Sequence, residues 1–375
     1  MKTINDILQW LEIAETTDKR QPWKVKHSLG DIIAIVSFAG MANADDWVEI
    51  EIVAKAYEHV LRKYLKLPNG IPSHDTIQRV FAMIDPLYLQ EFRDLWDETI
   101  SGSVGNVIRE LLGLSLDGKT ERGNGTDNQK PNHIVSAVDD RGICVGEVKT
   151  EEKSNEITAI PQLLKLLDIK GHIITIDAMG CQTDIAKVIV NKKAEYVLAV
   201  KGNQPILYED IRLYFEDSEL LAECLYTRKL EKAHGNSELR EYWQTEDISW
   251  LTQKKNWTGL KTIAMTKNTI TKKDGSVTTE VRYFISSLPP KVEDVAWAIR
   301  KHWMVESYHW HLDVTFKEDA NKTLEKRAAY NLNIIRKMAI NTLKLLDVGK
   351  KVSLKGKRLM LCCDFEKYLD QLMAM

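Results

Sequence analysis

The sequence predicts a mixed α/β protein, with helices at its N-terminus, a sheet region after them and a long helix near its C-terminus. Three observations predict this class. Apolar residues recur at helical spacing up to about residue 110, short apolar strand-like runs begin near Gly113, and two of these runs end in an aspartate. The 375 residues are enough for two or three domains.

Composition indicates an ordinary globular chain, with 44% apolar and 28% charged residues. No apolar run is long enough to span a bilayer, the N-terminus does not read as a signal peptide, and the five cysteines include no Cys-x-x-Cys pair. We therefore expect a cytoplasmic protein with reduced thiols and no membrane partner. The net charge of −2 does not by itself indicate a nucleic-acid binder, although basic patches can be local.

The N-terminal third is expected to be helical. Residues 29–42 are apolar on nearly every side, which predicts a core helix, and a longer helix is expected over 46–65 with Asp45 or Asp46 as its cap. A turn and a short helix over 76–84 follow. This order is compatible with a helix-turn-helix DNA-binding motif, and the alternative is an ordinary helical hairpin.

From about Gly113 the pattern changes to strands separated by turns and helices. The candidate strands cover residues 111–118, 133–138, 143–148, 173–177 and 196–200. Helices are expected before and after 173–177, so the last three strands should be parallel and joined by crossovers. The run 173–177 is β-branched and flanked by glycines, which is typical of a central strand buried on both faces.

The remaining chain is expected to begin with a helix over 204–218, followed by β-like segments up to Pro289-Pro290. The β-like segments cover residues 232–245, 260–270 and 278–285. We interpret them as a β-rich insertion. A long helix over 292–314 and a second over 324–346 should follow.

Three acids stand out because of where the predicted elements place them. Asp117 and Asp177 end two strands, and Glu306 lies in an aromatic, apolar part of the long helix. A carboxylate is costly in such places unless a cation meets it, and strand carboxyl ends are where open α/β sheets bind ligands. Oxygen ligands favour Mg²⁺ or Mn²⁺, and two such ions can activate a hydroxyl for attack on a phosphodiester. Each acid alone is better explained as a helix cap or a surface charge, and only the three together favour a metal site.

Several short sequence motifs, here called boxes, occur in an order along the chain that resembles a known family. They are Ser115–Lys119, Lys153–Ile157, Thr175–Gln182, Leu198–Gln204 and His302–Ser307, the last continued by Leu312–Asp319. On these boxes the chain resembles the DDE insertion-sequence transposases, within the H-repeat-associated group, over nearly its whole length. The resemblance implies a ribonuclease-H-like mixed sheet with flanking helices, interrupted by the β-rich insertion. It also implies Asp117, Asp177 and Glu306 as an acidic triad that binds two Mg²⁺ or Mn²⁺ ions.

The resemblance further implies DNA cleavage and strand transfer at the ends of an insertion sequence. The partners would be double-stranded DNA with terminal inverted repeats and a second copy of the chain on that DNA, at the bacterial nucleoid. The implied domain ranges are 1–108 (helical accessory, with possible DNA binding), 109–205 and 291–347 (catalytic), 206–290 (helix plus insertion) and 348–375 (tail).

The last helix departs from the pattern of the wider group, which often has Arg four residues before the acid and Lys seven after it. Those positions hold His302 and Asp313 here. Arg300 or Lys301 are candidates for the arginine's place and Lys317 for the lysine's. Asp313 and Glu318 are rivals for the third acid, and the box around Glu306 favours Glu306.

Candidate DNA-contacting residues flank the acids. They are Lys119, Arg122, Lys201, Asn203, Gln204, Arg300 and His302. Lys119 and Arg122 follow the first acid and would meet phosphates, or they are ordinary charges of a solvated loop. The Lys-Gly-Asn turn at 201–203 would meet a phosphate or an unpaired base, or it is a plain β-turn.

Two other functions compete with the transposase. Glu306-x-x-His309 has the spacing of a helical di-metal site, for which Glu231-x-x-His234 is the only second pair, and it lies in β-like sequence. The other alternative is a catalytically silent or domesticated DNA-binding relative of such a transposase.

Overall fold

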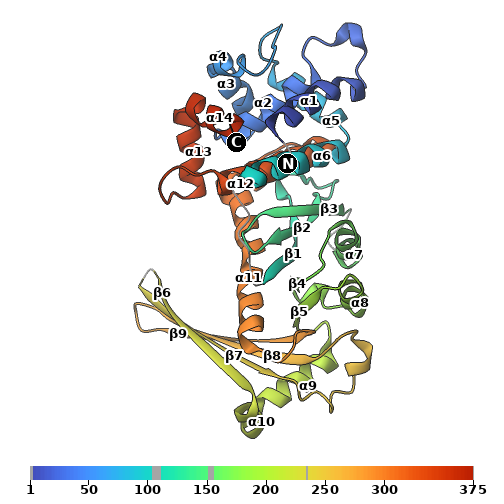
Figure 1. Cartoon of the computed structure of the whole chain (residues 1–375), viewed down its shortest axis with the longest axis vertical. Helices are drawn as coiled ribbons and strands as arrows, with labels where there is room; N and C mark the ends of the chain where they lie inside the picture. Colours follow the sequence, from blue (N-terminus) through green and yellow to red (C-terminus); the bar gives the residue numbers. More distant parts are fainter. Residues whose placement is uncertain (1–2, 104–110, 151–155, 234, 375) are drawn as a thin grey trace. The chain divides into compact units, whose positions relative to one another are not determined.

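The computed structural model describes residues 3–103, 111–150, 156–233 and 235–374, which fall into two compact units. The helical unit comprises residues 1–108, 120–132 and 308–375, and the sheet unit comprises residues 109–119 and 133–307. Figure 1 labels the elements of both. Among the described residues, no helix combines the length and apolar character needed to cross a membrane.

The helical unit contains most of the N-terminal helices that the sequence predicts. Its α-helices are α1 (Ile4–Ile13), α2 (Leu29–Met41), α3 (Trp47–Ala56), α4 (Glu58–Leu61), α5 (His74–Met83), α6 (Pro86–Ser103), α12 (Lys326–Leu345), α13 (Leu354–Cys363) and α14 (Phe365–Met373). The prediction of a single helix over 46–65 is wrong, because the structure has two shorter helices there, α3 and α4. The break is at Tyr57, whose φ of −109° and ψ of 19° are not helical. Asp46 is the cap of α3, since its carboxylate accepts the Glu49 N–H.

Helix α12 lies at the centre of the helical unit and packs against α2, α5 and α6. It is buried from Ala328 to Leu343 although it carries many polar residues. These side chains have specific partners: the Asn331 amide donates to the carbonyls of Phe81 and Ile84, at the end of α5. Buried polar groups need such partners, so α12 selects the register of the helices around it.

The loop 120–132 belongs to the helical unit and carries a buried acid, Glu121. Its carboxylate accepts hydrogen bonds from the amides of Asn124 and Asn132, both at 2.8 Å. Burial, and then the nearby charge of Glu318, raises the pKa of Glu121 to about 7. The folded chain therefore holds a proton on Glu121 more tightly than the unfolded chain does.

We expect stability of the helical unit to fall as the pH rises from about 4.5 to about 7. In this window the unfolded chain has already lost the proton that folded Glu121 still binds, and the loss can reach up to about 3 kcal/mol. Glu121→Gln keeps both hydrogen bonds without an ionisable group, so its free energy of unfolding should change less across the window. Urea denaturation at several pH values checks this, and parallel curves for the two proteins would contradict it.

The described residues of the sheet unit form one nine-stranded sheet in the order β3-β2-β1-β4-β5-β9-β8-β7-β6. The strands are β1 (Leu112–Thr120), β2 (His133–Asp139), β3 (Cys144–Thr150), β4 (His172–Ile176), β5 (Glu195–Val200), β6 (Leu225–Ala233), β7 (Asn236–Thr245), β8 (Thr262–Thr271) and β9 (Val277–Ser286). This is the mixed α/β fold that the sequence predicts, and it is consistent with a ribonuclease-H-like sheet.

The pairing corrects two details of the prediction. The parallel neighbours are β1, β4 and β5, whereas β3 pairs only with β2 and lies at the edge. The strands expected to form an insertion are present, but β9 pairs antiparallel with β5 and so extends the central sheet. The single segment expected over 232–245 is divided between β6 and β7, because the chain turns at Gly235 with a φ of +79°.

Helices cover both faces of the central strands (Figure 1). On one face, α7 (Glu156–Leu166), α8 (Thr183–Asn191) and α9 (Pro205–Glu216) pack over a core that includes Ile174 and Ile176. On the other face, α11 (Val292–Trp310) packs over a smaller core that includes Ile173. Neighbouring isoleucines of β4 thus point to opposite faces, which confirms the prediction of a strand buried on both sides.

Candidate active site

The pairing of β1 with β4 brings two of the predicted acids to the same edge of the sheet. Leu116 lies opposite Ile176 in the parallel register, so the next residues on the two strands are Asp117 and Asp177. Parallel strands end at the same edge, and this is where polar side chains of separate strands can converge. The third acid, Glu306, comes from α11 on the same unit.

All three acids line one cavity of about 270 Å³. The same cavity is lined by cationic or basic side chains from three elements, namely Lys201, Arg282 and His302. Phe284 and Trp303 add aromatic surface to its wall. The cavity therefore presents a cluster of carboxylates beside groups that can meet the phosphates of a nucleic acid.

Asp177 has two functions in the geometry of this site. Its carboxylate accepts the Met179 and Gly180 N–H groups, so it caps the short helix Ala178–Gly180, as the simplest reading of a lone aspartate predicts. It also lines the cavity. Burial, and then the charge of Asp117, raises the pKa of Asp177, because a second negative charge nearby disfavours ionisation.

A chain of polar contacts holds α11 against the two central strands. Thr175 donates to the Ser115 hydroxyl at 3.0 Å, and Ser115 donates to the Lys301 carbonyl at 3.2 Å. Nδ1 of His302 lies 3.1 Å from the Thr175 hydroxyl. These contacts involve β1, β4 and the turn of α11 just before Glu306, and so fix the helix that carries the third acid.

His302 is largely neutral at pH 7 in this position. Burial lowers the pKa of its imidazole, although the charges of the three acids around it act in the opposite direction. A guanidinium at this position, as in the wider pattern, would keep its charge. The difference makes His302 a hydrogen-bonding group here more than a permanent cation.

The donor set fits divalent cations by its chemistry. Three carboxylates border one cavity, and burial together with the neighbouring charge of Asp117 raises the pKa of Asp177, which a cation at this place would lower again. Over the part of the chain that the structure describes, no three His, Cys, Asp or Glu side chains already lie together as ligands of one ion. The three acids thus line one cavity without being grouped around the position of a single ion.

The structure distributes the predicted DNA-contacting residues over different places. Lys201 and His302 line the cavity, and the Arg300 guanidinium lies 5.9 Å from the Trp303 ring centre in an adjoining basic pocket. Asn203 and Gln204 donate to the carbonyls of Ala178 and Cys181, so they brace the turn that follows Asp177.

The two residues after the first acid differ from each other. Lys119 is only 9% exposed and does not line the cavity. Arg122 belongs to the helical unit, where its exposed guanidinium lies 3.8 Å from the Asp319 carboxylate. Their proposed contacts with phosphates stay a prediction.

Sequence reasoning missed Arg282, which lines the cavity from β9 and places its guanidinium 5.7 Å from the Trp303 ring centre. No local signal identifies it, because it reaches the site only through the antiparallel pairing of β9 with β5. Ser115 and Thr175 were visible inside two of the sequence boxes. Each lies two residues before an aspartate and therefore on the same face of its strand, and this spacing was the signal that could have identified them.

The rival assignments find less support in the geometry. Asp313 and Glu318 belong to the helical unit and do not line the cavity, and Glu318 is buried against the Asn333 amide. For the di-metal alternative, His234 lies outside the described residues, as does Asn155 of the Lys153–Ile157 box.

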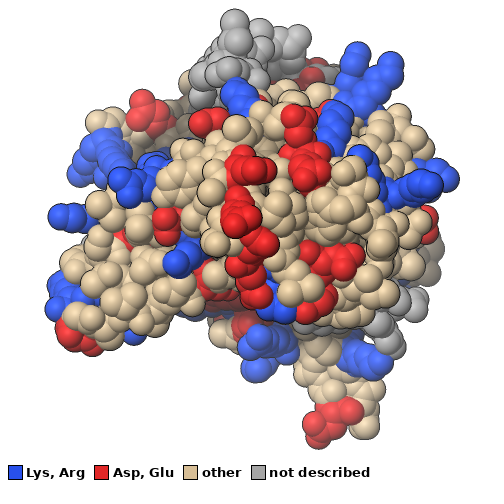
Figure 2. Space-filling view, turned by 90° about the horizontal axis from the view of Figure 1, so that it is seen from below, with Lys and Arg blue, Asp and Glu red and all other residues tan. Residues whose placement is uncertain are grey.

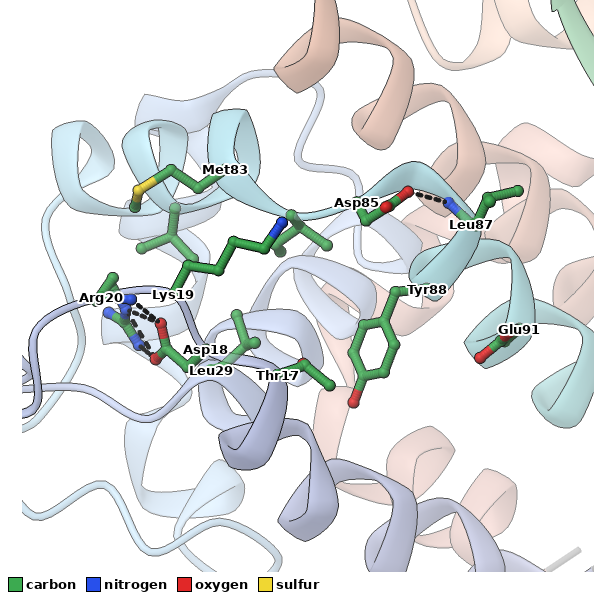
Figure 3. Close-up of a pocket in the computed structure, with 12 residues that line it drawn as sticks. Thr17, Asp18, Lys19, Arg20, Leu29, Met83, Asp85, Leu87, Tyr88 and Glu91 are labelled. Atoms are coloured by element: carbon green, nitrogen blue, oxygen red, sulfur yellow. Dashed lines mark hydrogen bonds and ion pairs between the residues drawn. The ribbon is translucent and has the colours of Figure 1, made fainter.

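A second cavity, of about 320 Å³, lies within the helical unit between the segment 17–20 and helices α5 and α6 (Figure 3). Polar groups of its lining residues pair with one another: Asp18 pairs with Arg20 at 2.5 Å, and Asp85 accepts the Leu87 N–H at the start of α6. Its lining also includes three acids, Asp18, Asp85 and Glu91, but none of them follows a strand of the sheet and Asp18 is already paired with a cation, so the cavity of the sheet unit is the candidate active site.

Comparison with known proteins identifies the family of the chain. The model of the "Transposase DDE domain" family matches residues 110–342, and the DDE_Tnp_1-associated model matches residues 10–96. The cryo-EM structure of a piggyBac transposase synaptic complex with hairpin DNA has a TM-score of 0.44 and 14% identity, over 99% of this chain and 79% of that one. This likeness is too low to bear on function.

Curated relatives match over most of their length. A putative transposase, YncI, of Escherichia coli O157:H7 is 38% identical over 98% of this chain and 95% of that protein. An H repeat-associated putative transposase, YhhI, of Escherichia coli K12 is 38% identical over 87% of both chains. The family matches and these relatives together place the chain: it belongs to the DDE transposases, in the H-repeat-associated group.

Proposed function

We propose that this protein cleaves DNA at the ends of an insertion sequence and transfers the cut strand by in-line attack on a phosphodiester. Asp117, Asp177 and Glu306 are the proposed acidic triad. The observation that carries the proposal is their convergence on one cavity from β1, the end of β4 and α11, in a chain of the DDE transposase family. A family of strand transferases gives such a carboxylate cluster a defined chemical use.

The three acids would hold two Mg²⁺ or Mn²⁺ ions. Bound there, the ions supply activation of the attacking hydroxyl and stabilisation of the leaving oxygen. The chain's own contribution is to hold the carboxylates on rigid elements and to close one side of the cavity with α11. Lys201 and Arg282 would contact the phosphate oxygens that do not react, since both side chains line the same cavity as the three acids.

Surface charge limits where DNA can approach the sheet unit. Figure 2 shows acidic side chains gathered at the centre of the face to which α9 and α10 (Ser218–Glu223) contribute. The exposed acids of these two helices and their connection include Glu209, Glu216, Asp217, Glu219 and Glu223. This face would repel phosphates. We therefore propose that double-stranded DNA with the terminal inverted repeats meets the unit on the side of the cavity and the adjoining basic pocket around Arg300.

Metal dependence is the first test. With Mg²⁺ or Mn²⁺, the full chain should cut DNA that carries the element ends, and chelation with EDTA should remove the activity. Ca²⁺, which prefers a larger and more flexible oxygen cage, should support DNA binding without cleavage. Gel analysis of cleavage and band shifts measures both. Cleavage that persists in EDTA would overturn the metal assignment.

The same assay separates the alternative of a catalytically silent DNA-binding relative. A silent relative would shift DNA that carries the ends and would cut none of it under any metal. Because each element has two ends, the active form on DNA is proposed to be a homodimer. Light scattering of the DNA-bound chain tests the stoichiometry, and a monomer on paired ends would contradict it.

A further inference from the structure

A buried, hydrogen-bonded histidine and glutamate lie beside the first acid without lining the cavity. His133 is the first residue of β2, Glu156 is the first residue of α7, and the His133 Nε2 lies 2.5 Å from a Glu156 carboxylate oxygen. The two residues are 2% and 4% exposed. The pair thus joins the start of a helix to the start of a strand inside the sheet unit.

The pair is in direct contact with the backbone of Gly118, the residue that follows Asp117. A Cβ atom at position 118 would lie 2.3 Å from the Glu156 carboxylate oxygen and 2.5 Å from the His133 Nε2. No side chain fits at these distances, so only glycine allows the pair to rest against this strand. The glycine after the first acid is therefore explained by close approach of two side chains, at a residue that lies within β1.

The second acid lies beside the first across the sheet. Leu116 of β1 is opposite Ile176 of β4 in the parallel register, so a displacement of the Asp117-Gly118 segment changes its distance from Asp177. The histidine and the glutamate that abut Gly118 therefore bear on the spacing of the two carboxylates, although neither lines the cavity.

We propose that His133 and Glu156 are positioning residues, which hold the Asp117-Gly118 segment at a fixed distance from Asp177. A buried polar pair is a weak source of stability, because the loss of hydration offsets the attraction between its members. A role in geometry accounts better for two polar side chains packed against β1 beside the first acid. The inference rests on the proposed function, since the position of the two carboxylates matters only if they hold reacting groups.

Two substitutions change the contact from opposite sides. Gly118→Ala pushes the pair away from the strand, and Glu156→Gln keeps the shape of the side chain but removes its charge. We expect each to lower kcat of Mg²⁺-dependent cleavage by roughly 10- to 100-fold with little change in KM for DNA, because a displacement of about 1 Å is enough to misalign a reacting group. Glu147→Gln, which neutralises another buried acid on β3, is the matched control and should keep the wild-type kcat.

A double variant tests whether the effect is transmitted through the contact. Glu156→Ala removes the closer of the two clashes with the methyl group of Gly118→Ala and leaves His133 room to move, so the two changes together should be less harmful than their separate effects combined. Additive losses would mean that the residues act independently and would overturn the proposal. A purely structural role predicts lower thermal stability with an unchanged kcat, which would also overturn it.

Hydrogen exchange tests the positioning role without an activity measurement. In Gly118→Ala and Glu156→Ala, backbone exchange should rise in 112–120 and in the first turn of α7 and stay as in the wild type over β6–β9. Unchanged exchange in 112–120 would refute the positioning role even in a protein that cuts DNA. If the wild type cuts no DNA, the proposed function fails, and the exchange result still stands for or against the pair.

Discussion

Asp177→Asn is expected to lower the rate of DNA cleavage by about 10³-fold or more, because a metal ligand supports several kcal/mol of transition-state stabilisation. The fold should be retained. Asparagine keeps the side-chain oxygen that accepts the Met179 and Gly180 N–H groups, so the cap of the short helix can form as before. The change therefore separates the two functions of this residue, a helix cap and a site carboxylate.

The measurement is single-turnover cleavage of DNA with element ends, with a band shift for binding and circular dichroism for the fold. Asp184→Asn is the matched control, since it makes the same change of charge at an exposed position in the first turn of α8. DNA binding should persist in both variants. Wild-type cleavage by the Asp177 variant would show that the triad is wrongly assigned.

The strand that carries Asp177 was predictable because several local signals agree. The isoleucines of 173–176 favour a strand, Gly171 supplies a φ of +75° before it, and the strand ends where Asp177 caps a short helix. When propensity, turn and cap indicate the same boundary, the sequence specifies the element without help from the rest of the chain. The same holds for α2, which Ser28 caps as it enters the core.

Other features depend on distant parts of the chain and were not predictable. The β-like segments read as an insertion, yet β9 enters the central sheet beside β5 and brings Arg282 to the cavity. The local sequence of β9 does not indicate which strand it pairs with, because strand propensity does not specify a partner. Lys119 reads as a solvated loop charge and is instead buried, since β1 continues past the first acid.

The alternative caps Asp45 and Asp46 show how adjacent identical residues acquire different roles. Asp46 caps α3 at the surface, whereas Asp45 is 6% exposed and lies 2.8 Å from the guanidinium of Arg358, which is fully buried in α13. The same guanidinium also donates to the carbonyls of Gly40, Ala44 and Thr315. Arg358 thus joins the end of α2 to two C-terminal segments within the helical unit.

Arg358→Met is expected to destabilise the helical unit by about 3–5 kcal/mol, because it leaves Asp45 buried without its closest cation and three carbonyls without the Arg358 donors. Lys317, 3.0 Å from the other Asp45 oxygen, moderates the loss but is itself mostly exposed to solvent. Lys355→Met, at an exposed position of the same helix, is the matched control and should change stability by less than about 0.5 kcal/mol.

Urea denaturation of the full chain measures these differences, and Asp45→Asn combined with Arg358→Met tests their cause. If the cost of Arg358→Met comes from an uncompensated carboxylate, neutralising Asp45 in the same chain should recover part of the lost stability. The three carbonyls remain without the Arg358 donors in the double variant, so recovery should be incomplete. Equal losses in the single and double variants would assign the effect to packing and to the carbonyl contacts of Arg358, and not to its charge.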